Sequence, residues 1–272
     1  MDQRSEQLPQ KELKLKFSGK TVASLKHPDR NEDAIGFPYG EEEKGLNWAA
    51  VLDGVGGLEH GELASRIAIE VISTNLSNLD PALKSEEVEK KIKETLQQAS
   101  RVVSEKVPGG ATTCVIVKIV EDDNGKTAVI GSVGDSRAYL LREGNLRLIT
   151  EDDSLIPVVL REEFDDTDGS DLDKYDYAIF RQRNIVTQSL GSDQEIGVHL
   201  YREKLNRGDM IILTSDGVHD NLTTREIEEV VAEGGDVAEA LVEKAKNRSV
   251  IPKEENIRAK PDDISAVVVE VF

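Results

Sequence analysis

The sequence predicts one α+β domain built of layers, in which a group of strands lies between pairs of helices. Two long segments, one starting near His60 and one around 88–103, repeat apolar residues at helical spacing. Short apolar or alternating runs bounded by turn residues follow between 111 and 150, and these are typical of strands. Because the strands and helices come in groups, the pattern favours α+β layers over alternating βαβ units.

The first elements follow one another clearly along the chain. Residues 1–12 are polar and predict a flexible tail, and one domain is expected over 13–272 because no repeat or low-complexity linker divides it. An alternation of apolar residues that starts at Leu13 predicts a strand. The run LNWAAVL predicts a buried strand that ends at Asp53, before the first of the two helices.

The rest of the chain continues with strands, turns and two shorter helices. The strand runs are ATTCVIVKIV, TAVIGSV, RAYLL, LRLIT, DMIILTS and ISAVVVEVF, with DDNG and EGN as hairpin turns. Thr223 and Glu226 form a capping box that opens the helix REIEEVVAE, and Gly234 with Gly235 ends it. A further helix is expected over 236–247.

Composition limits the range of functions. The formal charge of −19 excludes a nucleic-acid binder, which needs a basic face, and argues against an anionic membrane surface. The single cysteine, Cys114, lies in an apolar run and is expected to be a core residue in a reducing compartment. The N-terminus lacks an apolar signal region, and no apolar run approaches the roughly 18 residues of a membrane span. We therefore expect a cytoplasmic protein.

Acidic residues stand where the apolar strands begin or end. They are Asp53, Asp135, Asp216 with Asp220, and the pair Asp262 and Asp263. If these strand ends meet at one edge of the core, the carboxylates repel one another unless a cation neutralises them, since no lysine or arginine beside them in the sequence is expected to do so. An all-oxygen ligand set without histidine or cysteine indicates Mg²⁺ or Mn²⁺ rather than zinc. The alternative is that the Asp-Gly pairs only make turns.

Six motifs occur in order along nearly the whole chain. They are RNEDAIG (30–36), LDGVGG…GELAS (52–65), GGATTCVIV (109–117), VGDSRAYLLREGNLRLIT (133–150), LTSDGVHD (213–220) and PDDISAVVV (261–269). Together they resemble the metal-dependent protein Ser/Thr phosphatases, the PPM or type 2C class, in its bacterial form. The resemblance implies a four-layer αββα sandwich, in which two antiparallel sheets are flanked by helices and a two-metal site lies at one edge between the sheets.

The resemblance also implies roles for the residues at matching positions. Asp53 corresponds to the carboxylate that bridges both metals, and Gly54 corresponds to a ligand that uses its backbone carbonyl. Asp216 and Asp262 match the other ligands of the first metal. Glu32 matches the acid that reaches the second metal, usually through water. The three aspartates are therefore the candidate catalytic residues.

Many bacterial members bind a third, weaker metal, and Asp135 and Asp220 match its ligands, with Asp216 shared. The implied reaction is hydrolysis of phosphoserine or phosphothreonine, in which a water bridging two Mn²⁺ or Mg²⁺ ions roughly 4 Å apart attacks phosphorus directly. The alternatives are a catalytically inactive member that acts as a regulatory binding module, and a phosphatase of small phosphorylated metabolites. The expected partners are phosphorylated proteins, and a monomer is expected.

Three positions depart from the family pattern. Pro28 stands where members usually carry a phosphate-binding arginine, so Arg30 is a candidate to replace it, and the alternative is a surface arginine. Val55 stands where many eukaryotic members have a histidine, and His60 and His219 are expected to be structural or exposed. The usual Asp-Asn pair near the C-terminus is Asp-Asp here, so its second acid either tightens metal binding or accepts hydrogen bonds.

The segment over about 154–183 corresponds to the family's variable flap beside the active site. Its stretch REEFDDTDGSDLDKYD resembles a calcium loop, but Gly169 is the fourth residue from Asp166 and not the sixth, so the EF-hand spacing fails. The sequence predicts a mobile acidic flap that favours basic phosphopeptides, and the alternative is an acidic surface that only interacts with solvent.

Overall fold

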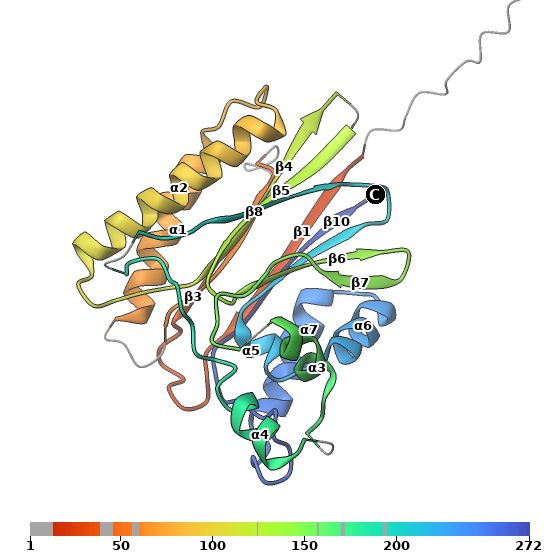
Figure 1. Cartoon of the computed structure of the whole chain (residues 1–272). Coiled ribbons are helices and arrows are strands. Elements are labelled where there is room, and N and C mark those ends of the chain that lie inside the picture. Colours follow the sequence, from red (N-terminus) through yellow and green to blue (C-terminus); the bar gives the residue numbers. More distant parts are fainter. Residues whose placement is uncertain are drawn as a thin grey trace, which may run out of the picture.

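In the computed structural model of the chain, two five-stranded antiparallel sheets lie face to face, and helices cover the outer face of each (Figure 1). The structure describes residues 13–38, 46–55, 60–123, 125–156, 158–169, 172–192 and 195–272. The predicted four-layer αββα arrangement is confirmed. The tail expected over 1–12 lies outside the described residues.

Every neighbouring pair of strands in the two sheets is antiparallel. One sheet contains, in spatial order, β1 (Leu15–Val22), β10 (Ile264–Val271), β9 (Met210–Thr214), β6 (Arg137–Arg142) and β7 (Asn145–Leu148). The other contains β2 (Asp33–Gly36), β3 (Trp48–Asp53), β4 (Cys114–Asp122), β5 (Gly125–Val133) and β8 (His199–Lys204). The chain passes between the sheets at several strand ends, which brings those ends together at the edge of the sandwich.

The side chains of strand β3 contribute to two hydrophobic cores, one on each face of its sheet. Its side chains alternate, so that Ala49 and Val51 face the other sheet and pack with residues such as Leu213 and Val267. Trp48 and the residues alternating with it face outward to the helices. A strand buried on both faces appears in the sequence as an unbroken apolar run, and β3 begins with such a run, WAAVL.

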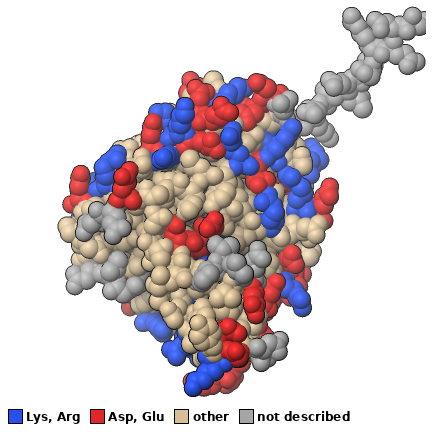
Figure 2. Space-filling model, in the orientation of Figure 1, with Lys and Arg blue, Asp and Glu red and all other residues tan. Residues whose placement is uncertain are grey.

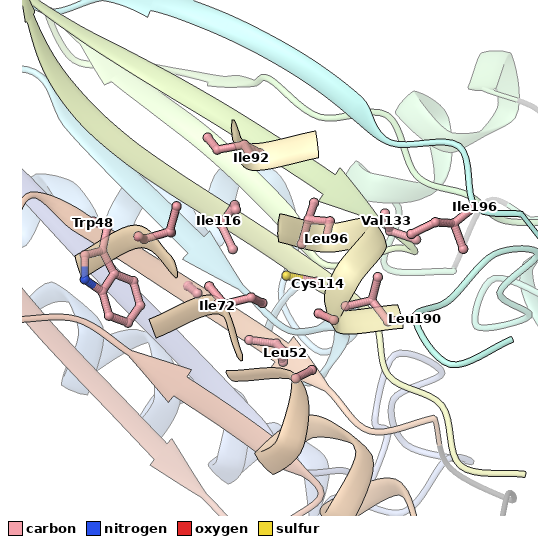
Figure 3. Close-up of a cluster of buried hydrophobic side chains, with 14 of the residues drawn as sticks. Trp48, Leu52, Ile72, Ile92, Leu96, Cys114, Ile116, Val133, Leu190 and Ile196 are labelled. Atoms are coloured by element: carbon pink, nitrogen blue, oxygen red, sulfur yellow. The ribbon is translucent and has the colours of Figure 1, made fainter. Parts of the chain in front are cut away.

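Helices α1 (Gly61–Ser77) and α2 (Ser85–Lys106) cover the sheet that contains β3. Figure 3 shows Ile72 of α1 and Ile92 and Leu96 of α2 in the same buried apolar cluster as Leu52 and Cys114. Cys114 is fully buried, as expected, and burial raises the pKa of its thiol. It is therefore a core side chain.

Helices α5 (Asp216–His219), α6 (Thr224–Glu233) and α7 (Val237–Ser249) cover the other sheet. The capping box of Thr223 and Glu226 is present, and Gly234 ends α6 with a φ of 72°. Among the described residues, no helix is long and apolar enough to cross a membrane.

Two strands have no counterpart among the sequence expectations. Strand β2 has only four residues and follows a charged stretch, so its period is too short to recognise. Strand β8, HLYREK, is mostly polar and lies at the edge of its sheet, and only Leu200 and Tyr201 pack against the cores on its two faces. It is defined by its pairing with β5, which a single-sequence pattern does not contain.

Candidate metal centre

The strand topology gathers the acidic residues at one edge between the two sheets. Thr214 of β9 is paired with Ala266 of β10, so Asp216 just after β9 lies beside the residues that lead into β10. In the other sheet, Asp33 and Asp53 are directly opposite each other in the register of β2 and β3. The ends of strands from both sheets therefore present carboxylates to one place.

Two glycines let the backbone come close at this edge. A Cβ on Gly54 would lie 2.6 Å from the backbone of Gly61 and 2.7 Å from the carbonyl oxygen of Glu32. A Cβ on Gly217 would lie 2.0 Å from the carbonyl oxygen of Asp263. No real side chain fits at these distances. The Asp-Gly pairs thus do more than make turns, because each glycine lets its aspartate sit against a neighbouring segment.

The carboxylates are close enough to raise one another's pKa. Loss of hydration raises the pKa of Asp53 well above its usual range, and the carboxylates of Asp33, Asp216, Asp262 and Asp135 raise it further. Burial raises the pKa of Asp216 to about 6, although Lys260 opposes the effect. Burial, followed by the charge of Asp216, raises the pKa of Asp135 to about 7. The acids that follow different strands therefore lie near enough to interact electrostatically, whereas the group whose ligand atoms lie within 4.8 Å of one another among the described residues is His27, Glu32 and Asp263.

The donor set suits a hard divalent cation. Oxygen Oδ1 of Asp216 is buried and has no hydrogen-bond partner, and the same holds for Oδ1 of Asp33. A buried carboxylate oxygen without a partner is costly unless a cation binds there. Asp53, Asp262 and the carboxylate of Glu32 add oxygen atoms of the kind that Mg²⁺ and Mn²⁺ prefer, while a nitrogen of His27 lies within 4.8 Å of carboxylate oxygens of Glu32 and Asp263.

The expectation that no basic residue accompanies these acids is wrong. Nζ of Lys260 lies 2.9 Å from Asp220 Oδ2 and 3.0 Å from Asp262 Oδ2, and it also donates to Asp216 Oδ2. Nε of Arg183 lies 3.1 Å from Asp220 Oδ1. Burial alone would raise the pKa of Asp220, but these two cations outweigh it and hold that pKa well below its usual range. Lys260 is only two residues from Asp262, and this closeness in the sequence could have indicated a cation beside the acids.

Asp33 is a further buried acid at this edge that the strand-end argument missed. Its Oδ2 accepts hydrogen bonds from Ser215 Oγ at 2.8 Å and Ser265 Oγ at 2.6 Å, and it is 7% exposed. The three residues join β2 to the ends of β9 and β10, so they lock the two sheets together next to the acids. The sequence feature that could have identified Asp33 is its position as the second acid of the pair Glu32 and Asp33, where β2 begins.

Asp263 accepts hydrogen bonds, as the second of its two expected roles requires, and it also offers a ligand atom within 4.8 Å of those of His27 and Glu32. Its Oδ1 accepts from the backbone N–H of Ser24, and its Oδ2 accepts from the backbone N–H of Glu32, both at 2.7 Å. Both oxygens are therefore engaged in fixing the loop that carries Glu32. An asparagine could offer only one acceptor oxygen to these two donors. Asp263 is thus a positioning residue for Glu32.

The remaining basic and histidine candidates occupy different places. The exposed Arg30 extends toward the acids, with Nη2 3.4 Å from Glu32 Oε1. His219 is buried, and its Nδ1 pairs with Thr214 Oγ1 at 3.0 Å, so it is structural as expected. His60 is exposed and precedes α1 with a φ of 72°. His219 is therefore structural and His60 is exposed, in agreement with the expectation.

The flap contains two helices, α3 (Val158–Asp166) and α4 (Lys174–Phe180), and its base is anchored. The rings of Phe164 and Phe180 pack edge to face at 5.5 Å between their centroids. Asp165 pairs with the buried Arg137 at 3.0 Å. Arg137, on β6, thus neutralises part of the flap's negative charge.

Arg258 ties the flap to the rest of the domain. Although it is only 2% exposed, its guanidinium donates to the carbonyls of Phe164 and Thr167 in the flap and to those of His219 and Leu222 near α5. One side chain therefore satisfies four backbone acceptors from two segments.

The surface beyond these contacts carries both signs of charge. On the face drawn in Figure 2, lysine and arginine side chains alternate with acidic ones around the margin, and one acidic group lies among uncharged residues. The excess of acid is therefore distributed over the surface as well as concentrated at the strand ends.

Replacing Arg258 with methionine should destabilise the protein and loosen the flap. The four carbonyls would lose their donor, and each buried unsatisfied acceptor costs about 1–3 kcal/mol unless water reaches it. We expect Arg258→Met to lower the free energy of unfolding in urea by about 2 kcal/mol or more, and to speed limited proteolysis within 167–174. Arg225→Met, at an exposed position on α6, is the control. Unchanged stability and proteolysis in Arg258→Met would contradict the anchoring role.

Comparison with known proteins places this geometry in a family. The family model described as Protein phosphatase 2C matches residues 23–251. Serine/threonine phosphatase stp of Listeria monocytogenes is 29% identical over 245 residues, which cover 88% of this chain and 90% of that protein. The structure of serine/threonine phosphatase Stp1 from Staphylococcus aureus superposes with a TM-score of 0.76 at 23% identity, covering 98% of this chain and 99% of that one. The catalytic domain of the serine threonine protein phosphatase PstP, solved with two manganese ions, has a TM-score of 0.69 at 23% identity over 96% of this chain and 99% of its own. The chain belongs to the protein phosphatase 2C family.

Proposed function

We propose that the chain is a Mn²⁺- or Mg²⁺-dependent phosphatase that hydrolyses phosphoserine and phosphothreonine in proteins. The observation that carries the proposal is the convergence of Asp53, Asp216 and Asp262, from strand ends of both sheets, around a buried carboxylate oxygen that has no partner. Membership of the family supports the reaction class. The relatives named as serine/threonine phosphatases support the substrate class.

The proposed ligands divide between two cation positions. Asp53 would contact both, Asp216 and Asp262 would complete the first, and the Gly54 carbonyl with Glu32 would serve the second. When bound, the two cations would supply the Lewis acidity that promotes direct attack of water on phosphorus. The manganese in the PstP structure is consistent with this choice of metal.

The protein's own groups hold this ligand set in place. Thr112 Oγ1 and the backbone N–H of Thr113 donate to the carbonyl oxygen of Asp53 at 2.9 and 2.8 Å. The backbone N–H of Gly54 donates to the Glu32 carbonyl at 3.0 Å, which couples the bridging acid to the loop fixed by Asp263. These contacts place carboxylates at close range without relying on flexible side chains.

Arg30 is the proposed phosphate-binding residue. Its guanidinium lies at the rim beside Glu32, is half exposed, and can pair with two phosphoryl oxygens at once. Exposed acids on the flap, such as Glu163, Asp166 and Asp173, would favour substrates with basic residues near the phosphate.

Turnover should require added Mn²⁺ or Mg²⁺. We expect hydrolysis of a phosphothreonine peptide and of p-nitrophenyl phosphate to disappear in EDTA and to return when Mn²⁺ is added in excess, because the proposed ligands are all oxygens. In the comparison assay, Zn²⁺ is added in place of Mn²⁺ and the turnover is compared. Full turnover by chelator-treated, metal-free protein would refute metal dependence.

Asp53→Asn and Asp216→Asn should each abolish turnover while the fold remains. They should differ in metal-free stability, however. The named neighbours that raise the pKa of Asp53 are all acids, so removing its charge should stabilise the metal-free protein at pH 7. Asp216 has Lys260 as a partner, so its substitution should not give the same gain. The measurements are steady-state kinetics at saturating Mn²⁺ and thermal unfolding in EDTA.

Asp80→Asn, at an exposed position far from the acids in sequence, is the control for both variants. Wild-type turnover by either Asp53→Asn or Asp216→Asn would show that the ligands are assigned wrongly.

Arg30→Ala should mainly raise KM for a phosphopeptide. A charge-assisted contact to bound substrate is worth about 1.5–3 kcal/mol, which corresponds to a change of roughly ten- to a hundredfold. If the contact strengthens in the transition state, kcat should fall as well. Mn²⁺ binding should not change, because the arginine is no ligand. Lys26→Ala, exposed in the same loop, is the matched control, and equal constants in Arg30→Ala and Lys26→Ala would make Arg30 an ordinary surface residue.

A further inference from the structure

The corner formed by Asp135, Asp216 and Asp220, here called the third-cation corner, already contains a positive charge from the chain. The ammonium of Lys260 contacts Asp216 and Asp220 together, and it lies 3.0 Å from Asp262 Oδ2. Its side chain is only 14% exposed. The ammonium of Lys260 therefore places a positive charge among three carboxylates, of which Asp216 and Asp220 belong to this corner.

Each oxygen of Asp220 already accepts from a side-chain cation. Its Oδ2 accepts from Lys260 at 2.9 Å, and its Oδ1 accepts from Arg183 Nε at 3.1 Å. Arg183 is itself held, because its guanidinium lies 4.2 Å from the centre of the Phe180 ring at the base of the flap. Both oxygens of one expected ligand are thus paired with side-chain cations.

The backbone of Lys260 is fixed so that its side chain reaches this corner. Asn221, which is fully buried, accepts from the Lys260 N–H and donates to the Lys260 carbonyl, both at 3.0 Å. The same amide of Asn221 donates to the carbonyl of Gly217 at 2.8 Å. A buried asparagine therefore joins the lysine to α5, the short helix that carries Asp216. This support makes the lysine a built part of the site.

We propose that Lys260 supplies from within the chain the charge that a third metal ion supplies in other members, so that the third-cation corner binds no metal while Lys260 is present. The inference rests on the proposed two-metal function. Two divalent cations, Lys260 and Arg183 together balance the charge of six ionised carboxylates. These six are Glu32, Asp53, Asp135, Asp216, Asp220 and Asp262.

The test is the number of Mn²⁺ ions that the chain binds at saturation. Equilibrium dialysis, with free Mn²⁺ measured by its EPR signal, should give two ions per wild-type chain. Lys260→Gln removes the charge and frees an oxygen of Asp216 and one of Asp220, so we expect three. Lys260→Arg keeps the charge and should bind two. Lys253→Gln, at an exposed position seven residues earlier, is the matched control and should also bind two.

A double variant locates the extra ion. Asp135→Asn combined with Lys260→Gln should return the count to two, because Asp135 is the corner acid that neither Lys260 nor Arg183 contacts among the ion pairs of the described residues. Three ions bound by the wild-type chain would overturn the inference. So would an unchanged count in a folded Lys260→Gln, as judged by circular dichroism. If Lys260→Gln does not fold, the wild-type count still decides whether the corner binds a metal ion, since three ions would overturn the inference.

The same experiment separates this inference from the proposed function. The gain of one ion on removing Lys260 decides the role of the lysine, whatever the turnover. Phosphopeptide turnover by the wild-type chain, together with at least two bound ions, decides the proposed function. If Lys260→Gln gains an ion but the wild-type chain shows no turnover, the inference about Lys260 stands and the proposed function is refuted.

Discussion

Mutual repulsion among carboxylates at one edge of a β-sandwich is the constraint on which the rest of this structure depends. Backbone geometry, not side-chain attraction, brings the acids together, because they occupy the ends of strands whose register is set by two cores. The uncompensated charge costs stability in the metal-free chain. The neighbouring acids raise the pKa of Asp53 because their charges meet in a site with little water.

The domain meets this cost by rigid support around the acids. The serine pair on Asp33, the two N–H groups on Asp263 and the asparagine behind Lys260 each join segments far apart in sequence. Because each link satisfies a buried polar group, losing one would leave its partner unpaired as well as loosen the site. Stability and ligand geometry are therefore coupled: the contacts that hold the sandwich closed also keep the acids in position.

The fold and the placement of acids at the strand ends could be predicted from the sequence, since both follow from local patterns. The apolar run before Asp53, the helical spacing after His60 and the capping box at Thr223 each specify their element. The closeness of Lys260 to Asp262 is visible in the sequence, but its contacts with Asp216 and Asp220 could not be predicted in this way, because a lysine in a loop is ordinarily a solvated residue. Its direction depends on Asn221, which is 39 residues earlier in the sequence.

The position of β10 in its sheet has a consequence for folding on the ribosome. This strand lies between β1 and β9, and it pairs with both. A nascent chain in which β10 is still inside the exit tunnel exposes the facing edges of both strands, as well as an apolar inter-sheet surface. Since the contacts of β1 with β10 span most of the sequence, folding must wait for a slow, long-range pairing. The domain therefore gains its metal-binding edge only after synthesis of its final strand, and its nascent form is the state most exposed to aggregation.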